Sequence, residues 1–119
     1  MKRTDQRVAD RLDRMLEAMA RIGHYTEDMT GDMFRVDSLV QDAVIYNLGI
    51  VGKVASDVER IQPDFAATHA HVRWKHLRQT CDRIVHDYFS FDADLAWQWI
   101  TRELPVLKEQ LAQIRRQTS

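Results

Sequence analysis

Residues 74–91, WKHLRQTCDRIVHDYFSF, carry the clearest helical pattern of the chain. Apolar residues recur there at steps of three and four, which places them on one face of an amphipathic helix: Trp74, Leu77, Cys81, Ile84, Val85 and Tyr88. The other side is ionisable: Lys75, Arg78, Asp82, Arg83, His86 and Asp87. An imidazole and a phenol stand two positions apart just before Phe89-Ser90-Phe91-Asp92 breaks the pattern. Polar groups at such a helix end can face a cleft.

The rest of the chain has the same helical periodicity. We expect helices over residues 5–29, 38–60 and 74–91, and a fourth that starts at the N-cap Asp92 and is kinked at Pro105, which lacks a backbone N–H. Ser38 and Gln41 have the spacing of a capping box. Residues 33–36 are expected to form a connecting turn, and residues 62–71 a loop after Pro63. The sequence therefore predicts an all-α fold, a single domain over residues 1–119 arranged as an antiparallel four-helix bundle.

The composition of the chain limits the classes of protein to which it can belong. The chain has 119 residues, a net charge of −1 and a single Cys. It can bury a core without disulfides, and any RNA contact must use a local patch of basic residues. No apolar run approaches the ~20 residues of a membrane span, and the charged start shows no signal peptide. A cytoplasmic protein without membrane contact is expected.

The helix of residues 74–91 and its flanks resemble a known family, the HEPN toxins of the HepT group. The likeness rests on Val-His-Asp-Tyr-Phe at residues 85–89, with Asp92, Leu95, Trp97 and Leu104-Pro105 behind it and Gln41-Asp42-Ala43-Val44, Asn47-Leu48 and Gly52 in the second helix. In that family a His-x-Tyr follows an Arg with four residues between Arg and His. His86 and Tyr88 match, Asp82 matches the polar residue after the Arg, and Cys81 occupies the Arg position.

The resemblance implies the toxin of a prokaryotic toxin–antitoxin pair, which cleaves RNA without metal or other cofactor. The Arg would hold the phosphate, and His86 would act on the 2′-hydroxyl or the leaving oxygen. A thiol at Cys81 brings neither fixed charge nor a bidentate fork, so weakened activity is expected. The resemblance also implies a nucleotidyltransferase antitoxin that adds AMP to Tyr88.

Each of these residues also has a simpler explanation. Cys81 fits a small buried core residue. Tyr88 fits a core aromatic with its hydroxyl at the rim. Asp82 can orient His86 or form an ordinary solvated pair with it. A phosphate-binding patch can be drawn from basic residues near the motif, although most of these charges can also be merely solvated: Arg73, Lys75, Arg78 and Arg83.

Other side chains bear on metal binding and assembly. The scattered His24, His69, His71 and His76 lack spaced acidic or Cys partners, so no metal site is predicted. On a regular helix His86 and Tyr88 diverge by about 200°, so a shared site needs helix fraying or a two-fold homodimer. Trp97 and Trp99 lie on different faces of a helix, so one can be core while the other covers a partner; together with Met33 and Phe34 they predict a subunit interface. In the alternative to the interface, Trp99 is buried and Trp97 is half-exposed.

Two further readings of the whole chain stay open. One is a catalytically silent HEPN bundle that serves as binding partner or substrate of a nucleotidyltransferase, which Cys81 favours. The other is an unrelated helical adaptor in which the polar residues are incidental.

Overall fold

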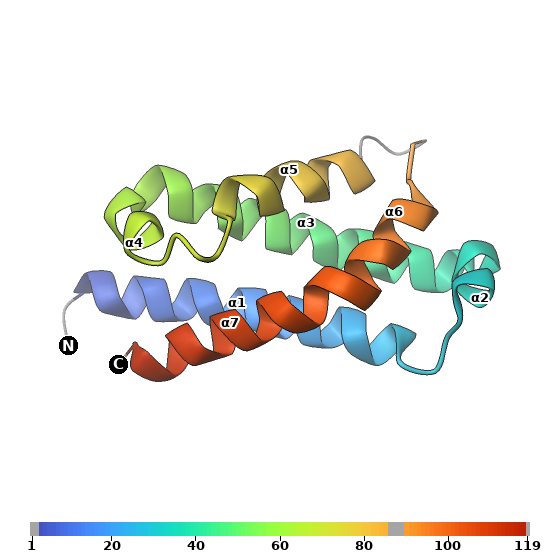
Figure 1. Ribbon diagram of the computed structural model, residues 1–119, viewed down its shortest axis with the longest axis horizontal. Coiled ribbons are helices and arrows are strands. Elements are labelled where there is room, and N and C mark those ends of the chain that lie inside the picture. The colour runs from blue at the N-terminus through green and yellow to red at the C-terminus, as the bar shows by residue number, and fades with distance from the viewer. Residues whose placement is uncertain (1–2, 86–89, 119) are drawn as a thin grey trace.

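The computed structural model describes residues 3–85 and 90–118. This part of the chain is helical and has no β-strand, which confirms the all-α class (Figure 1). The elements in chain order are α1 (Arg3–Thr26), α2 (Gly31–Val36), α3 (Ser38–Ile61), α4 (Pro63–Thr68), α5 (Trp74–Ile84), α6 (Ala93–Gln98), the π-helical turn η1 (Trp99–Glu103) and α7 (Leu104–Gln117).

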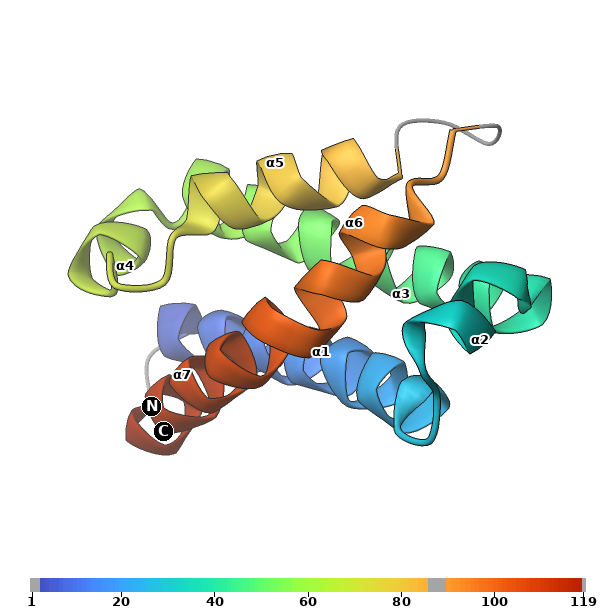
Figure 2. The same cartoon turned by 45° about the vertical axis from the view of Figure 1, so that its right-hand side comes forward.

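Helix α3 is the centre of the arrangement, because both α1 and α5 pack along it. Helix α7 packs on α1, and α2 packs against α3 and α6. The molecule is elongated, with extents of 46 × 26 × 21 Å. Figure 2 shows the segment from α6 to α7 running obliquely past α1 and α3, so the regular antiparallel four-helix bundle stays a prediction.

The core is built from the apolar stripes that the sequence predicts. Each stripe lies on one face of its helix, and burying these faces against each other removes the apolar surface from water. The buried members include Leu12, Met15, Met19 and Ile22 of α1, Val44, Leu48, Val51, Ala55 and Val58 of α3, Trp74, Leu77, Cys81 and Ile84 of α5, and Trp99, Leu104, Leu111 and Ile114 near the C-terminus.

Two segments expected to be irregular form short helices instead. Thr30, expected to stop the first helix, is the N-cap of α2, where its hydroxyl accepts a hydrogen bond from the Met33 N–H at 3.2 Å. Pro63, expected to end one helix, opens α4, because a missing N–H costs nothing in a first helical turn. The predicted turn at residues 33–36 and the predicted loop at residues 62–71 were therefore wrong in part.

The start of α3 also differs from the expectation in one position. Its N-cap is Asp37, whose carboxylate accepts from the Val40 N–H at 3.0 Å, and Ser38 is already inside the helix. The Gln41 side-chain amide donates to the carbonyls of Phe34 and Arg35, at 2.8 and 3.0 Å. Gln41 thus closes the end of α2 and is not the partner of a capping box at Ser38.

The last segment begins where the sequence predicts. The Asp92 carboxylate accepts from the Leu95 N–H at 2.9 Å, which makes Asp92 the N-cap of α6. Further on, the Leu104 N–H donates to the Trp99 carbonyl five residues back, which defines the π-helical turn η1. Pro105 follows at once, in the first turn of α7, where the loss of its N–H is tolerated. The kink at Pro105 stays a prediction.

Candidate functional site

The helix that carries the motif is shorter than expected. Helix α5 ends at Ile84, and Val85 is its C-cap with φ −115° and ψ 78°. The motif residues His86 and Tyr88 lie outside the described residues. The expectation of one helix over residues 74–91 was therefore wrong at its C-terminal end, because Val85 already leaves helical geometry.

The chain on either side of the motif is held together by backbone contacts. Val85 and Phe91 form an antiparallel β-bridge. The Asp92 N–H donates to the Ile84 carbonyl at 3.0 Å. Because Asp92 also caps α6, the end of α5 and the start of α6 are fixed to each other on either side of the stretch that contains His86 and Tyr88.

Cys81 lies in the core of the chain, as its place in the apolar stripe predicts. Its side chain is 4% exposed and packs against Gly52 of α3, where an added Cβ would stand 3.1 Å from the Cys81 Cβ. Burial, with smaller contributions from the charges of Asp82 and Glu103, raises the pKa of the Cys81 thiol to about 12. The thiol is neutral at pH 7, so this position supplies no charge of either sign.

The two arginines expected to bind RNA have different surroundings. The Arg78 Nε donates to the Glu59 carboxylate of α3 at 3.0 Å, and both side chains are about one third exposed. Arg83 is exposed and, like Asp82, forms no ion pair with any residue in the described ranges. Of the two, Arg83 is therefore the cation that is available to a ligand.

Arg83 lines an open hollow of about 630 Å³ beside the motif. The hollow also includes Ser90, Phe91 and Arg35, the last from α2. Arg35 is bound to Asp32 and, at 2.6 Å, to Asp94. Its pKa is raised, mainly by the hydrogen bond to Asp94 and by the charge of that carboxylate. Arg35 was not found from the sequence, because nothing in the spacing brings α2 next to residues 59 positions later.

Asn47, which the family resemblance had included, occupies an unusual position in α3. It is buried, its amide donates to the Ala43 carbonyl at 2.9 Å, and its Oδ1 has no hydrogen-bond partner in the part of the chain that the structure describes. A buried acceptor without a partner costs on the order of 1–3 kcal/mol. Asn47 therefore lowers the stability of the fold at this position.

Two of the aromatic residues named for a subunit interface, Phe34 and Trp97, contact each other within the chain. Phe34 is completely buried, and its ring lies 5.3 Å from that of Trp97. Trp97 is partly buried and covers Gly31, so α2 and α6 are joined by this contact. Phe34 thus has no surface left for a partner, Met33 is exposed, and the subunit interface as a whole stays a prediction. Trp99 is buried, as the alternative had it.

The described residues bear on metal and membrane binding as well. Across residues 3–85 and 90–118, no three His, Cys, Asp or Glu side chains are grouped so that they could hold a metal ion. The rings of His69 and His71 lie 6.0 Å apart, and burial together with the charge of His71 lowers the pKa of His69. None of the described helices is long and apolar enough to cross a membrane.

Comparison with known proteins decides the family. The family model described as "Ribonuclease HepT-like" matches residues 15–114. The chain belongs to the ribonuclease HepT-like family. This chain is 28% identical over 116 residues to the "Probable ribonuclease HepT" of Thermococcus cleftensis, which covers 98% of this chain and 100% of that protein.

Two relatives from Methanocaldococcus jannaschii carry the same likeness. One, a "Putative RNase", is 32% identical over 91 residues, 76% of this chain and 73% of that protein. The other, a "Gamma-glutamylcyclotransferase and putative RNase", is 31% identical over 103 residues, 87% of this chain but only 45% of its own length. The chain thus spans less than half of that relative. No solved structure matches the chain significantly.

Proposed function

We propose that this HepT-like chain is the toxin of a prokaryotic toxin–antitoxin pair and cleaves RNA as a metal-independent endoribonuclease of reduced activity. The observation that carries the proposal is the family match over residues 15–114, which includes the spaced pair His86 and Tyr88. Relatives named as ribonucleases support the activity. The toxin role rests on the resemblance to the HepT group.

The proposed chemistry is divided among four side chains. His86 moves the proton, either from the attacking 2′-hydroxyl or to the leaving oxygen, because an imidazole titrates near neutral pH. Asp82, exposed four positions earlier, orients the imidazole. Arg83, exposed and without an ion pair among the described residues, attracts the phosphate, with Arg78 behind it in its pair with Glu59. The family Arg is replaced by Cys81, so the developing charge on the phosphate lacks its strongest partner.

A homodimer is part of the proposal, because a shared site needs groups from two copies. Large apolar side chains are exposed on α2 and the first half of α3: Val36 is 84% exposed, Leu39 80% and Tyr46 67%. Figure 1 shows this part of α3 on the same side of the molecule as the end of α5. An interface there would bring the two motif ends together and remove the apolar patch from water.

The control of the proposed toxin lies at Tyr88. A nucleotidyltransferase antitoxin would attach AMP to its hydroxyl. The added phosphodiester carries a negative charge, which competes with the RNA phosphate for the same cations.

One observation favours a second function, a catalytically silent partner or substrate of the nucleotidyltransferase. The Cys81 thiol is neutral and buried, so the position that should hold the phosphate cannot do so. The test is cleavage of an end-labelled RNA in EDTA by the wild type and by His86→Ala. Slow cleavage that is lost in His86→Ala supports the ribonuclease. Equal background in both proteins contradicts it and leaves the silent partner.

A further inference from the structure

A second cleft lies at the other end of α5, away from the motif. It has a volume of about 260 Å³ and opens between the start of α5, η1 and the first half of α7. Its floor is apolar and formed by Leu77, Trp99 and Leu107, all of them buried. The base of the cleft is therefore apolar and well packed, and the polar interactions that it can offer a ligand come from the side chains around its rim.

The rim of the cleft is basic. Arg73, the N-cap residue of α5, and Arg102 of η1 line it; both are exposed, and neither forms an ion pair with a described residue. Among the described residues that line the cleft, the acid is Glu103, which is already bound to His76, with 3.3 Å between Oε1 and Nε2. Two permanent positive charges thus face the cleft without an acidic partner among residues 3–85 and 90–118, which makes the cleft attractive to an anion.

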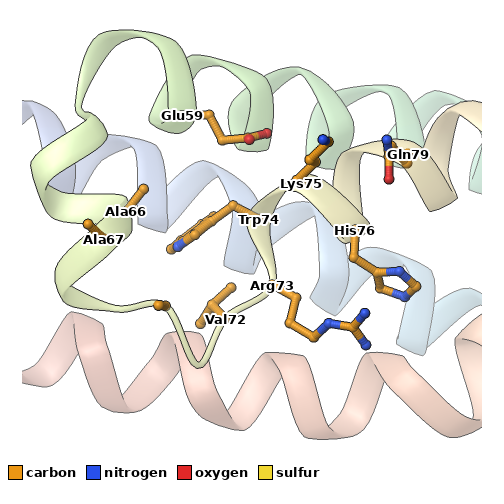
Figure 3. A pocket seen from close by; sticks show the side chains of 10 residues that line it. Glu59, Ala66, Ala67, Val72, Arg73, Trp74, Lys75, His76 and Gln79 are labelled. Carbon is orange, nitrogen blue, oxygen red and sulfur yellow. The ribbon is translucent and has the colours of Figure 1, made fainter.

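The helix that supplies Arg102 has an uncommon geometry at this point. Trp99, Arg102 and Glu103 all belong to the π-helical turn. Such turns are rare and are found frequently at functional sites. Figure 3, a close view of the neighbouring pocket, shows Arg73, just before α5, and His76, within α5, both projecting toward α7. The cleft is thus built by two elements that converge on it with their polar side chains.

The size of the cleft restricts what it can hold. Sites that enclose a whole small molecule usually have volumes of about 300–1,000 Å³. A cleft of about 260 Å³ fits a phosphate group with the adjoining sugar atoms better than a complete nucleotide. Guanidinium groups suit this group, because their paired N–H donors match phosphate oxygens.

We propose that this cleft binds a backbone phosphate of the RNA strand, away from the bond that is cleaved. From His76 to Ile84 the helix advances roughly 12 Å at 1.5 Å per residue. A nucleic-acid strand advances about 3.4 Å per nucleotide in a duplex, so about four nucleotides separate the cleft from the motif end. The inference rests on the proposed ribonuclease function, because it takes RNA as the ligand.

The test measures RNA binding and not cleavage. The probe is a fluorescent single-stranded 2′-O-methyl RNA of about twelve nucleotides, which has no free 2′-hydroxyl to attack. Arg73→Gln/Arg102→Gln should weaken its binding about tenfold or more, as expected when charge-assisted hydrogen bonds are lost. The slope of log affinity against log salt should fall by about 0.7 for the phosphate that is released.

Two matched variants control for charge and folding. Arg14→Gln/Lys108→Gln removes the same charge from exposed residues outside the cleft, and should keep the wild-type affinity and salt dependence. Arg73→Lys/Arg102→Lys keeps the charge and should recover much of the binding. If both Gln double variants weaken binding equally, the effect is net charge alone and the cleft assignment is wrong.

Titration with a mononucleotide distinguishes the two possible ligands of the cleft, a free nucleotide and a phosphate of the RNA strand. AMP is titrated into labelled protein while the indole N–H signal of Trp99 is followed by NMR. If AMP shifts this signal and the RNA does not bind, the cleft holds a mononucleotide and the strand proposal is overturned. Binding of neither ligand overturns the site. RNA binding that depends on Arg73 and Arg102 without any cleavage by the wild type keeps the cleft and contradicts only the ribonuclease.

Discussion

The Cβ of Cys81 faces Gly52 so closely that a methyl group on Gly52 would stand 3.1 Å from it. This distance is shorter than ordinary contacts between carbon atoms, which are about 3.5–4.0 Å. Helices α3 and α5 therefore approach each other closely at the position where the family pattern has Arg. Small residues on both helices allow the contact, which ties the packing of the fold to the chemistry of the motif.

Replacing Gly52 by Ala should therefore not stabilise the protein, whereas replacing a glycine with open space around it should. Gly23 lies inside α1 with nothing within 4 Å of an added Cβ, so Gly23→Ala should raise the free energy of unfolding by about 0.5–1 kcal/mol through helix propensity. Gly52→Ala has the same propensity gain but must push Cys81 away. We expect it to be neutral or destabilising in urea unfolding. A gain equal to that of Gly23→Ala would contradict the close contact.

The Cys81 thiol should be almost unreactive in the folded protein. Its pKa rises from 9.0 to about 12, and the thiolate is the reactive species, so the pKa change alone lowers the reaction rate at pH 8 about a thousandfold. Alkylation followed by mass spectrometry should be slow in buffer and fast in urea. Fast alkylation of the folded protein at pH 8 would show that Cys81 is accessible.

The same burial makes stability depend on pH above neutrality. Below pH 9.0 the thiol is protonated in both states, and its contribution to stability is constant. Between pH 9.0 and about 12 the unfolded chain releases the proton while the folded chain keeps it, so stability falls as pH rises. Comparing urea unfolding of wild type and Cys81→Ala across this range isolates the effect. A difference between them that does not change with pH would contradict the raised pKa.

The sequence predicted the core of this site better than its edges. The stripe in α5 placed Cys81 in the core, and the N-cap at Asp92 followed from its residue type. The end of α5 could not be predicted in this way, because the apolar pattern continues past Ile84 although Val85 pairs with Phe91. That pairing joins residues across the motif and leaves no trace in helical periodicity.

Contacts between helices that are distant in the chain could likewise not be predicted from the sequence. Arg78 has the spacing of a solvated residue, and only the packing of α5 on α3 brings Glu59 to it. The cleft rim formed by Arg73 and Arg102 depends on the approach of η1 to the start of α5. Short helices such as α4 were missed since Pro63 can end one helix and begin another.

Cys81→Arg should increase RNA cleavage in EDTA. Removing one donor that stabilises charge in a transition state typically costs a factor of ~10²–10³, so restoring the cation should recover activity of this order. His86→Ala in the same background should abolish it. Because residue 81 is buried against Gly52, the new side chain must extend past the core to reach solvent, at some cost in stability.

Cys81→Met separates charge from size in that experiment. Met also fills the space with a long flexible side chain but carries no charge. It should lose stability without gaining cleavage. If Cys81→Met and Cys81→Arg cleave at the same rate, or if the wild type already cleaves as fast as Cys81→Arg, the assignment of residue 81 to the phosphate is wrong.

The exposed apolar patch on α2 and α3 should control assembly. Leu39→Glu places a charge on a side chain that is 80% exposed, so it should not disturb the folded monomer. It should convert the proposed dimer into a monomer in sedimentation experiments at tens of micromolar, because a charge buried in an interface is costly. Val106→Glu, on the exposed face of α7, is the control. A wild type that is already monomeric would overturn the dimer.

Tyr88 should accept AMP whether or not the protein cleaves RNA. Modification needs only an accessible hydroxyl and a cognate nucleotidyltransferase with ATP, so the wild type with its neutral Cys81 should be a substrate as good as Cys81→Arg. After co-expression with the nucleotidyltransferase, mass spectrometry of the protein should find one or more AMP units on the peptide that contains Tyr88. Tyr88→Phe should carry none, while Tyr46→Phe, which removes the hydroxyl of an exposed tyrosine of α3, should be modified as the wild type is. In Cys81→Arg the added charge should also suppress cleavage, because it repels the incoming strand. AMP that persists on Tyr88→Phe would place the control at another residue.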